Sequence, residues 1–479
     1  MAFEIPNFYP ALPEIIIFAL SSLCLLAHAF LGDKRSNVTY YLVQISILIS
    51  LAVTYLFLEI DAKQLTFDNT FVVDKFSVIL KLFAQLSVFL CFLYSRVYIK
   101  DHKMPRGEYY LLGLFSMMGM MVLISSNHFL TLFLGLELTS LPVYAMVALK
   151  RDSTVSTEAA IKYFIVGAIA TGMLLYGLSM LYGATGHLEF NQVANSIAQM
   201  GSGQRMLVLF GLVFAMVGIA FKLGAVPFHM WVPDVYQGAP SSVTMFIATA
   251  PKIAAMGMAV RLLVNAMPDI NFQWQQILIA ISILSMGLGN FGAIAQTNIK
   301  RMLAYSSIAH MGYMVLGLLT ATKAGYAAST FYMVTYSLMT LGAFGLIVML
   351  SQAGYEFEEI DDFKGLNAKS PWLAFMMMIL MFSMAGVPPV VGFMAKLAVL
   401  KALIASGFVW LAVLALLFAI VGAYYYIRIV KVMYFEEPEK VSPLSCPRDM
   451  TIAISVNALA VLALGVFPSA LLALCQSAF

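Results

Sequence analysis

The sequence predicts an all-α polytopic membrane protein with about fourteen transmembrane helices. Of its 479 residues, 62% are hydrophobic and only 11% are charged, whereas a soluble domain carries roughly 25% charged residues. The polar residues are too few to cover the surface of a water-soluble globule of this size. The alternation of apolar and polar residues that marks a membrane β-barrel does not occur. The composition therefore excludes a soluble enzyme, a disordered chain, a collagen and a nucleic-acid binder.

Apolar runs near the length that crosses a bilayer, about 20 residues, follow one another along the whole chain. They cover approximately residues 11–31, 38–59, 76–97, 109–126, 128–149, 159–184, 205–228, 241–263, 274–295, 301–320, 327–351, 371–405, 408–432 and 451–476. The run 371–405 is interrupted by Gly386, Pro388, Pro389 and Gly392. Because each half is too short to cross alone, we interpret this run as one discontinuous helix.

The loops carry two charge patterns. Lysine and arginine gather in the loops on one side of the predicted bundle, and the positive-inside rule assigns that side to the inside, with both termini outside. Residues 1–10 lack the basic segment of a signal peptide, so we expect the first helix to be retained. The longest inside loop, 354–370, is acidic. It is either a solvated loop or a docking surface for a cytoplasmic partner.

Several charged residues remain inside the apolar runs, where each costs from about 2.5 to well above 10 kcal/mol. The basic ones are Lys81, Lys162, Lys222, Lys252, Lys396 and Lys401, and Glu137 is the clearest acidic one. Such residues face protein or water, pair with one another, and usually mark an ion path. Lys81 and Lys401 lie nearer the ends of their runs, so we expect them to snorkel.

Glu137 lies in an apolar stretch that extends for roughly two turns on either side. A carboxylate in that position needs a cationic partner or must carry a proton. Lys162 stands four residues after Glu158 on the next predicted helix, so these two could form an ion pair. Lys162 is therefore also a possible partner for Glu137, and a purely structural ion pair is the alternative interpretation.

Three of the lysines stand beside predicted breaks in helices. Lys222 precedes Gly224 and Pro227, Lys252 follows Pro251, and Lys396 follows the interruption at 386–392. Broken helices expose backbone carbonyl groups, and transporters place ion sites at such breaks. Lys222 and Lys396, each beside a break, suggest an inverted internal repeat, unless their pairing arose by chance.

Lysine suits proton transfer because burial makes its ammonium easier to deprotonate, whereas arginine stays charged. His310 could link Lys252 to Lys396 through water, or it could be an ordinary core histidine. The predicted relay consists of Glu137, Lys162, Lys222, Lys252, His310 and Lys396. The four cysteines and six histidines form neither a CxxC nor a His-x-x-x-His pair, so we expect no metal site and no redox cofactor on this chain.

Three segments carry a resemblance to a known family. They are KLGAVPFHMWVPDVYQGAPSSVTMF (222–246), KRMLAYSSIAHMGYMVLG (300–317) and MAGVPPVVGFMAKL (384–397). They resemble the proton-conducting, antiporter-like subunits of respiratory complex I and the related multisubunit sodium/proton antiporters. The resemblance covers roughly residues 105–435.

Within this family, three features favour the N branch over its L and M paralogues. The motif LGLELTSLPVYAMVAL, which contains Glu137, lacks the tryptophan that L and M usually have before that glutamate. Lys396 occupies a position where M typically has a glutamate. The chain also ends soon after its last predicted span, without the long lateral helix of L.

The resemblance implies two inverted five-helix repeats, 106–265 and 266–435, each with a discontinuous helix. They would lie between a three-helix segment, 1–105, and a final loop and helix, 436–479. It also implies that Glu137 pairs with Lys222 or Lys162, that Lys252 links two half-channels, and that Lys396 is the second proton carrier.

The function implied by the resemblance is proton translocation by a membrane-arm subunit of NADH:quinone oxidoreductase in the bacterial inner membrane. NADH, FMN, iron–sulfur clusters and quinone would bind to partner subunits, and the neighbours would be other antiporter-like and small membrane subunits. Two alternatives are a subunit of a sodium/proton antiporter and a structural subunit that does not pump.

Overall fold

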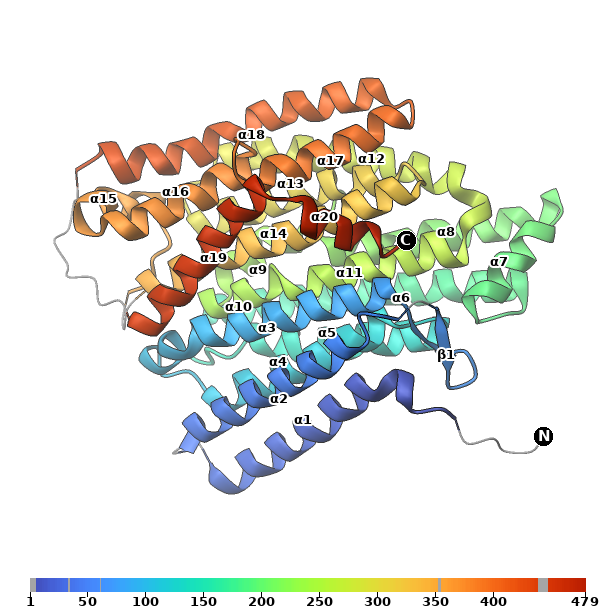
Figure 1. Cartoon of the computed structure of the whole chain (residues 1–479), viewed down its shortest axis with the longest axis horizontal. Helices are drawn as coiled ribbons and strands as arrows, with labels where there is room; N and C mark the ends of the chain where they lie inside the picture. The colour runs from blue at the N-terminus through green and yellow to red at the C-terminus, as the bar shows by residue number, and fades with distance from the viewer. Residues whose placement is uncertain (1–5, 33–34, 61, 352–354, 438–446) are drawn as a thin grey trace.

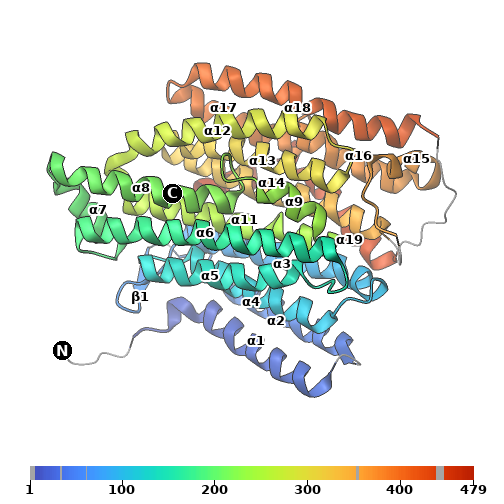
Figure 2. The same cartoon turned by 180° about the vertical axis from the view of Figure 1, so that it is seen from behind.

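The computed structural model describes residues 6–32, 35–60, 62–351, 355–437 and 447–479. Long helices lie side by side in one bundle (Figures 1 and 2). Twelve of the described helices are long and apolar enough to cross a membrane. The two remaining predicted spans correspond to α13 (Ile299–Leu318) and to the broken pair α16 (Pro371–Ala385) and α17 (Val391–Ala405). The prediction of an all-α polytopic membrane protein is confirmed.

The first segment of the chain contains three long helices and a small hairpin. Its elements are η1 (Tyr9–Ala11), α1 (Leu12–Leu31), α2 (Ser36–Leu56), β1 (Gln64–Thr66), β2 (Phe71–Val73) and α3 (Lys75–Asp101). The strands pair antiparallel, with Gln64 opposite Val73. The sequence did not predict this hairpin, because strands of three residues are too short to show alternation. Helix α1 lies at the edge of the bundle (Figure 1).

After the first segment, the chain up to residue 435 forms two further groups of helices. The first group contains α4 (Arg106–Ile124), α5 (Phe129–Val147), α6 (Thr154–Thr185), α7 (Phe190–Gln199), α8 (Ser202–Leu223), α9 (Trp231–Gly238), α10 (Ser241–Ile247), α11 (Ala250–Val260) and η3 (Arg261–Ala266). The second contains η4 (Pro268–Ile270), α12 (Asn271–Ile294), α13, α14 (Lys323–Leu350), η5 (Ile360–Phe363), α15 (Leu366–Lys369), α16, α17 and α18 (Val409–Phe435). The two inverted repeats, with the boundaries 106–265 and 266–435, stay predictions.

A local detail recurs in the two groups. Helix α5 begins at His128, which forms an isolated β-bridge with Glu189 after α6. Helix α13 begins at Asn298, which bridges to Glu359 after α14 in the same way. In each case the capping side chain accepts a hydrogen bond from a backbone N–H of the first turn. The same connection therefore fixes the start of both helices.

Both predicted breaks are present. Helix α8 ends at Gly224 (φ 72°) and α16 ends at Gly386 (φ 84°), each in the left-handed conformation that glycine adopts without a Cβ clash. The chain resumes as α9 at Trp231 and as α17 at Val391. A third interruption separates α10 from α11 at 248–249, just before Lys252. The discontinuous interpretation of 371–405 is therefore correct.

The last predicted span, 451–476, is wrong as a single helix. It consists of α19 (Arg448–Val466) and α20 (Ser469–Gln476), because Pro468 cannot continue the hydrogen-bond pattern of α19. Helix α20 packs against α14 and α3. The ring of Phe479 lies 5.2 Å from that of Phe76 and 5.5 Å from that of Tyr326.

The acidic loop binds the chain's own side chains, which neither interpretation of the sequence foresaw. Glu356 accepts hydrogen bonds from Tyr98 and Ser241 and lies 3.4 Å from His102 Nε2. Glu358 forms an ion pair with Lys300 at 2.6 Å. These contacts direct two of the loop's carboxylates toward side chains of the helices.

An aspartate–arginine pair ties three helices together at the predicted outer end. Asp74 caps α3 by accepting the Ser77 N–H, and both its oxygens accept hydrogen bonds at 2.8 Å from Arg261, which is 2% exposed. Arg261 also donates to the Ile124 carbonyl of α4 at 3.0 Å. Burial alone would raise the pKa of Asp74, but the Arg261 charge and the hydrogen bonds from Arg261 and Ser77 hold that pKa below its usual range.

Replacing this carboxylate tests the closure of the outer end. We expect Asp74→Ala to lower the free energy of unfolding by about 3–5 kcal/mol, because Arg261 loses its partner while buried. The contribution of Asp74 is fully present above the ordinary pKa of aspartate, near 3.9, and is lost as the pH falls toward its lower pKa in the folded protein. Thermal unfolding of the detergent-purified protein at pH 7 and at pH 2, below the ordinary pKa of aspartate, measures both effects. The control is Asp269→Ala, an exposed aspartate, and equal stability of the two variants would contradict this role.

Candidate functional site

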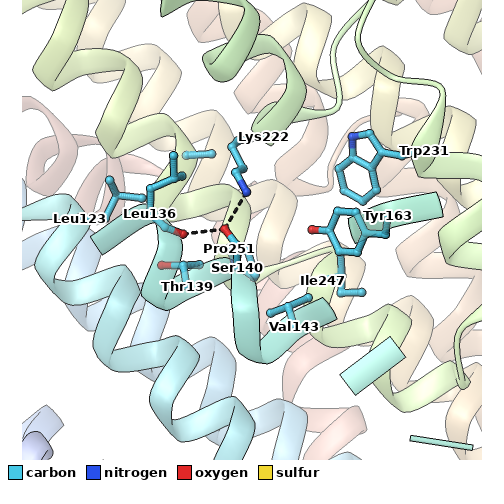
Figure 3. Close-up of a pocket in the computed structure, with 11 residues that line it drawn as sticks. Leu123, Leu136, Thr139, Ser140, Val143, Tyr163, Lys222, Trp231, Ile247 and Pro251 are labelled. Carbon is cyan, nitrogen blue, oxygen red and sulfur yellow. Dashed lines mark hydrogen bonds between the residues drawn. The ribbon is translucent and has the colours of Figure 1, made fainter. Parts of the chain in front are cut away.

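Lys222 reaches from the last turn of α8 to hydroxyl groups on α5. Its Nζ donates to Ser140 Oγ at 2.6 Å and to the Tyr144 hydroxyl at 3.5 Å. Figure 3 shows the amine pointing at Ser140, with Tyr163 and Trp231 on another side of the pocket. The cavity there measures about 20 Å³, room for about one water molecule. Lys222 therefore has a hydroxyl partner and space for water beside it.

Glu137 lies near this amine but does not touch it. It stands three residues before Ser140 on α5, so the two side chains are neighbours on the helix surface. Its charge attracts Lys222 through space. Within the described ranges, however, no hydrogen bond or ion pair to Glu137 is formed. The implied direct pair of Glu137 with Lys222 or Lys162 is absent, because Ser140 and other carboxylates already hold the two amines.

Lys162 is instead part of a charged cluster at the predicted inner end of the bundle. Its Nζ lies 2.9 Å from Glu158 and 3.2 Å from Asp234, and its side chain is 47% exposed. Asp234 also binds Arg301 at 2.8 Å. The predicted Glu158–Lys162 pair is confirmed. Asp234 could not be foreseen as a partner, because only the break after α8 brings the short helix α9 against both α6 and α13.

Lys252 lies at the centre of the bundle, only 1% exposed. Its Nζ donates to Ser307 Oγ on α13, and Ser307 also accepts a hydrogen bond from the Tyr336 hydroxyl at 2.7 Å. The rings of Tyr236 and Tyr336 lie 5.7 and 5.6 Å from the amine, close enough for cation–π attraction. Lys252 therefore has aromatic faces and a hydroxyl around it.

His310 stands one turn after Ser307 on α13 and is 3% exposed. Its Nδ1 lies 2.7 Å from the hydroxyl of Tyr332, and its Nε2 lies 3.0 Å from that of Tyr426. The predicted proximity of His310 to Lys252 follows from this position, because residues three apart share a helix face. The tyrosines were missed, since each lies on a different helix far away in the sequence.

Lys396 lies against the break of its own discontinuous helix. Its Nζ donates to the carbonyl groups of Ala385 at 2.8 Å and Met384 at 3.3 Å, which end α16. These carbonyls lack partners within the helix and form the negative end of its dipole. The amine also lies 5.1 Å from the ring of Tyr313. The expectation that a broken helix offers carbonyls to an ion site is met here.

A buried ion pair away from the lysines described above was not predicted. Lys81, 1% exposed, forms an ion pair with Glu14 at 2.5 Å and lies 5.1 Å from the ring of Phe71. The expectation that Lys81 snorkels is wrong, because α1 brings a carboxylate to it inside the bundle. Glu14 near the start of the first apolar run was the available signal. Lys401 is exposed.

Metal-binding side chains are as scattered in the fold as in the sequence. Over the described residues, no three His, Cys, Asp or Glu side chains lie close enough together to hold a metal ion. Cys24, Cys91 and Cys475 are buried and free. Cys446 lies outside the described residues.

Fold and site together define an antiporter-like membrane subunit: an apolar bundle with two broken helices, a lysine at each of these breaks and a buried lysine, Lys252, on another helix. Residues 126–422 match the family described as NADH:quinone oxidoreductase/Mrp antiporter, TM. The chain belongs to this family and, within it, to the group of NADH-quinone oxidoreductase subunit N. Proteins of that name from Coxiella burnetii and Thioalkalivibrio sulfidiphilus are 58% and 51% identical to it, over 100% of this chain and 100% and 99% of theirs. The sequence-based choice of the N branch is confirmed.

Solved structures show the same fold. A chain of respiratory complex I from Thermus thermophilus with bound aureothin is 32% identical, with a TM-score of 0.83 over 96% of this chain and 98% of that chain. A chain of the Mrp complex from Dietzia has a TM-score of 0.86 over 98% of this chain and 97% of that chain. Its identity is 18%, so this second likeness concerns the fold alone.

Separating the Lys81–Glu14 pair tests whether it holds α1 in place. We expect Lys81→Met to destabilise the protein by about 3–5 kcal/mol, because Glu14 is left buried without a cation. The double variant Glu14→Gln/Lys81→Met should recover most of this loss, since it removes both charges. The melting temperature of the purified protein measures the effect, with Lys401→Met as the control. A single variant as stable as the double variant would contradict the pairing.

Proposed function

We propose that the chain is a proton-translocating subunit in the membrane arm of a bacterial NADH:quinone oxidoreductase. The names of its full-length relatives support this assignment. Electron transfer would occur on partner subunits, which would hold NADH, FMN, iron–sulfur clusters and quinone. The neighbours in the membrane would be antiporter-like and small membrane subunits. The membrane would be the bacterial inner membrane, with both termini on its periplasmic side.

The observation that best supports the proposal is the type of hydrogen-bond partner of each of the three central lysines. Lys222 and Lys252 donate to serine hydroxyls, and Lys396 donates to backbone carbonyls. A carboxylate partner would hold an amine in its charged form, whereas a hydroxyl can accept from an ammonium or donate to a neutral amine. A hydroxyl partner therefore permits both protonation states that a proton carrier must adopt.

Glu137 would control the first of these amines by its charge. It is not bonded, so a movement in a neighbouring subunit could change its distance from Lys222. At an effective dielectric near 20, moving a unit charge from 4 to 8 Å away changes the interaction by about 2 kcal/mol. Because 1.36 kcal/mol corresponds to one pKa unit, such a movement would change the proton occupancy of Lys222.

The remaining predicted residues extend the relay from this amine. The proton would pass from Lys222 to Lys252, then by His310 to Lys396 and the outer face. Lys162 would join the relay from the inner end. In the present arrangement Glu158 and Asp234 hold its amine, so Lys162 would reach Glu137 only when the Asp234 contact opens.

Removal of the amines tests the relay. We expect Lys222→Met, Lys252→Met and Lys396→Met each to lower the number of protons pumped per NADH oxidised, because methionine fills the space but carries no proton. Inverted membrane vesicles containing the assembled complex allow both quantities to be measured. Lys401→Met is the matched control, since Lys401 lies on the same helix as Lys396 and is exposed.

The same vesicles distinguish the two alternatives. Full pumping by all three variants in an assembled complex contradicts the relay and assigns the chain a structural role. Exchange of sodium for protons by this chain without NADH oxidation contradicts the redox-coupled function and assigns it to an antiporter.

A further inference from the structure

Three helices meet around His310 and surround it with hydroxyl groups. Tyr332 comes from α14, Tyr426 from α18, and Ser306 and His310 from α13. Both tyrosine side chains are at most 2% exposed. Each of the two ring nitrogens of His310 has one tyrosine hydroxyl as its hydrogen-bond partner. The imidazole is therefore hydrogen-bonded on both sides.

The chemistry of a neutral imidazole fixes how these bonds run. One ring nitrogen donates and the other accepts, and the two can exchange roles by a change of tautomer. A tyrosine hydroxyl can do either. One tyrosine must therefore donate to His310 while the other accepts from it. Reversal of the tautomer reverses both bonds without any movement of the ring.

We propose that Tyr332 and Tyr426 carry protons to and from His310, so that the proton crosses the imidazole from one ring nitrogen to the other. This inference rests on the proposed function and names two further proton-carrying residues for it. When a proton reaches the Tyr426 oxygen from the Lys252 side, the hydroxyl hydrogen of Tyr426 passes to Nε2. The Nδ1 hydrogen then passes to the Tyr332 oxygen, and the original Tyr332 hydrogen leaves on the Lys396 side. No bond other than O–H and N–H forms or breaks, and the ring ends neutral in its other tautomer.

Hydrogen bonds continue beyond the histidine. The Tyr426 hydroxyl lies 2.5 Å from Ser306 Oγ, which can pass a hydrogen to it on receiving a proton. One passage leaves the hydroxyls and the tautomer reversed. The next proton in the same direction crosses only after the hydroxyls rotate and the imidazole ring turns over to restore the first arrangement. Transfer in the opposite direction uses the same groups in reverse order.

The position of this cluster explains why hydroxyls are needed there. On one side, Lys252 and Tyr336 share Ser307, one turn before His310. On the other side, the ring of Tyr332 stacks on that of Tyr313 at 6.3 Å, and Tyr313 lies beneath the Lys396 amine. The cluster thus lies between two proposed proton carriers, in a buried part of the bundle where side-chain hydroxyls replace bulk water.

Removal of single hydroxyl groups tests the proposal in the assembled complex. We expect Tyr332→Phe and Tyr426→Phe each to slow proton pumping at least roughly tenfold, since a positioned proton-transfer group contributes about 10²–10⁴-fold to a rate. The matched control is Tyr425→Phe. Tyr425 neighbours Tyr426 on α18 and is 1% exposed, but its hydroxyl donates to Asn290 instead of His310.

The measurement is the initial rate of NADH-driven acidification in inverted vesicles, divided by the amount of complex. NADH oxidation with an artificial electron acceptor gives that amount. A loss of pumping confined to Tyr332→Phe and Tyr426→Phe supports the proposal. An equal loss in Tyr425→Phe, or a loss of pumping only in proportion to the amount of complex, overturns it by showing a structural role.

The variant Lys252→Met, measured in the same vesicles, distinguishes a failure of the tyrosine proposal from a failure of the proposed function. If it abolishes pumping by this subunit while both phenylalanine variants pump normally, the tyrosine proposal is wrong and the proposed function stands. If Lys252→Met also pumps normally, the proposed function itself fails.

Discussion

An amine inside an apolar helix bundle must find hydrogen-bond acceptors from protein, because lipid tails offer none. The arrangement of the helices around each of these amines depends on which groups supply the hydrogen-bond acceptors. Lys222 and Lys252 use serine hydroxyls, and Lys396 uses the last carbonyls of α16. The fold brings the element that supplies each acceptor close to the amine. The interruption of the helix lies directly after α16, where the last carbonyls of α16 accept hydrogen bonds.

The two broken helices use their free carbonyls differently. At the end of α8, the indole N–H of Trp231 donates to the Phe221 carbonyl at 3.1 Å. Lys222 is thereby left to reach across to α5. At the end of α16, Lys396 donates to the carbonyls of Ala385 and Met384. Ser140 and His310, which stand at matching distances from the caps of α5 and α13, differ accordingly: Ser140 binds Lys222 directly, and His310 binds tyrosines.

Ion pairs join helices at both ends of the bundle, whereas the lysines in the middle have uncharged hydrogen-bond partners. Asp74 and Arg261 join α3 to α11 at one end, and Lys300 and Glu358 join α13 to the acidic loop at the other. Such pairs keep their charges fixed, because each partner stabilises the charged form of the other. The central amines have hydroxyls and carbonyls instead. Fixed charges at the ends and exchangeable protons in the middle are consistent with a path for protons along the bundle.

The sequence by itself determined most of the spans and the breaks beside Lys222 and Lys396, because hydropathy, glycine and proline act locally along the chain. It also pointed to the family through three short motifs. It could not determine the partners, since these come from helices far apart in sequence. Tertiary structure alone placed Asp234 beside Lys162, Glu14 beside Lys81, and two tyrosines on His310. Side-chain pairing depends on which helix faces meet, and a pattern read along one helix does not contain that information.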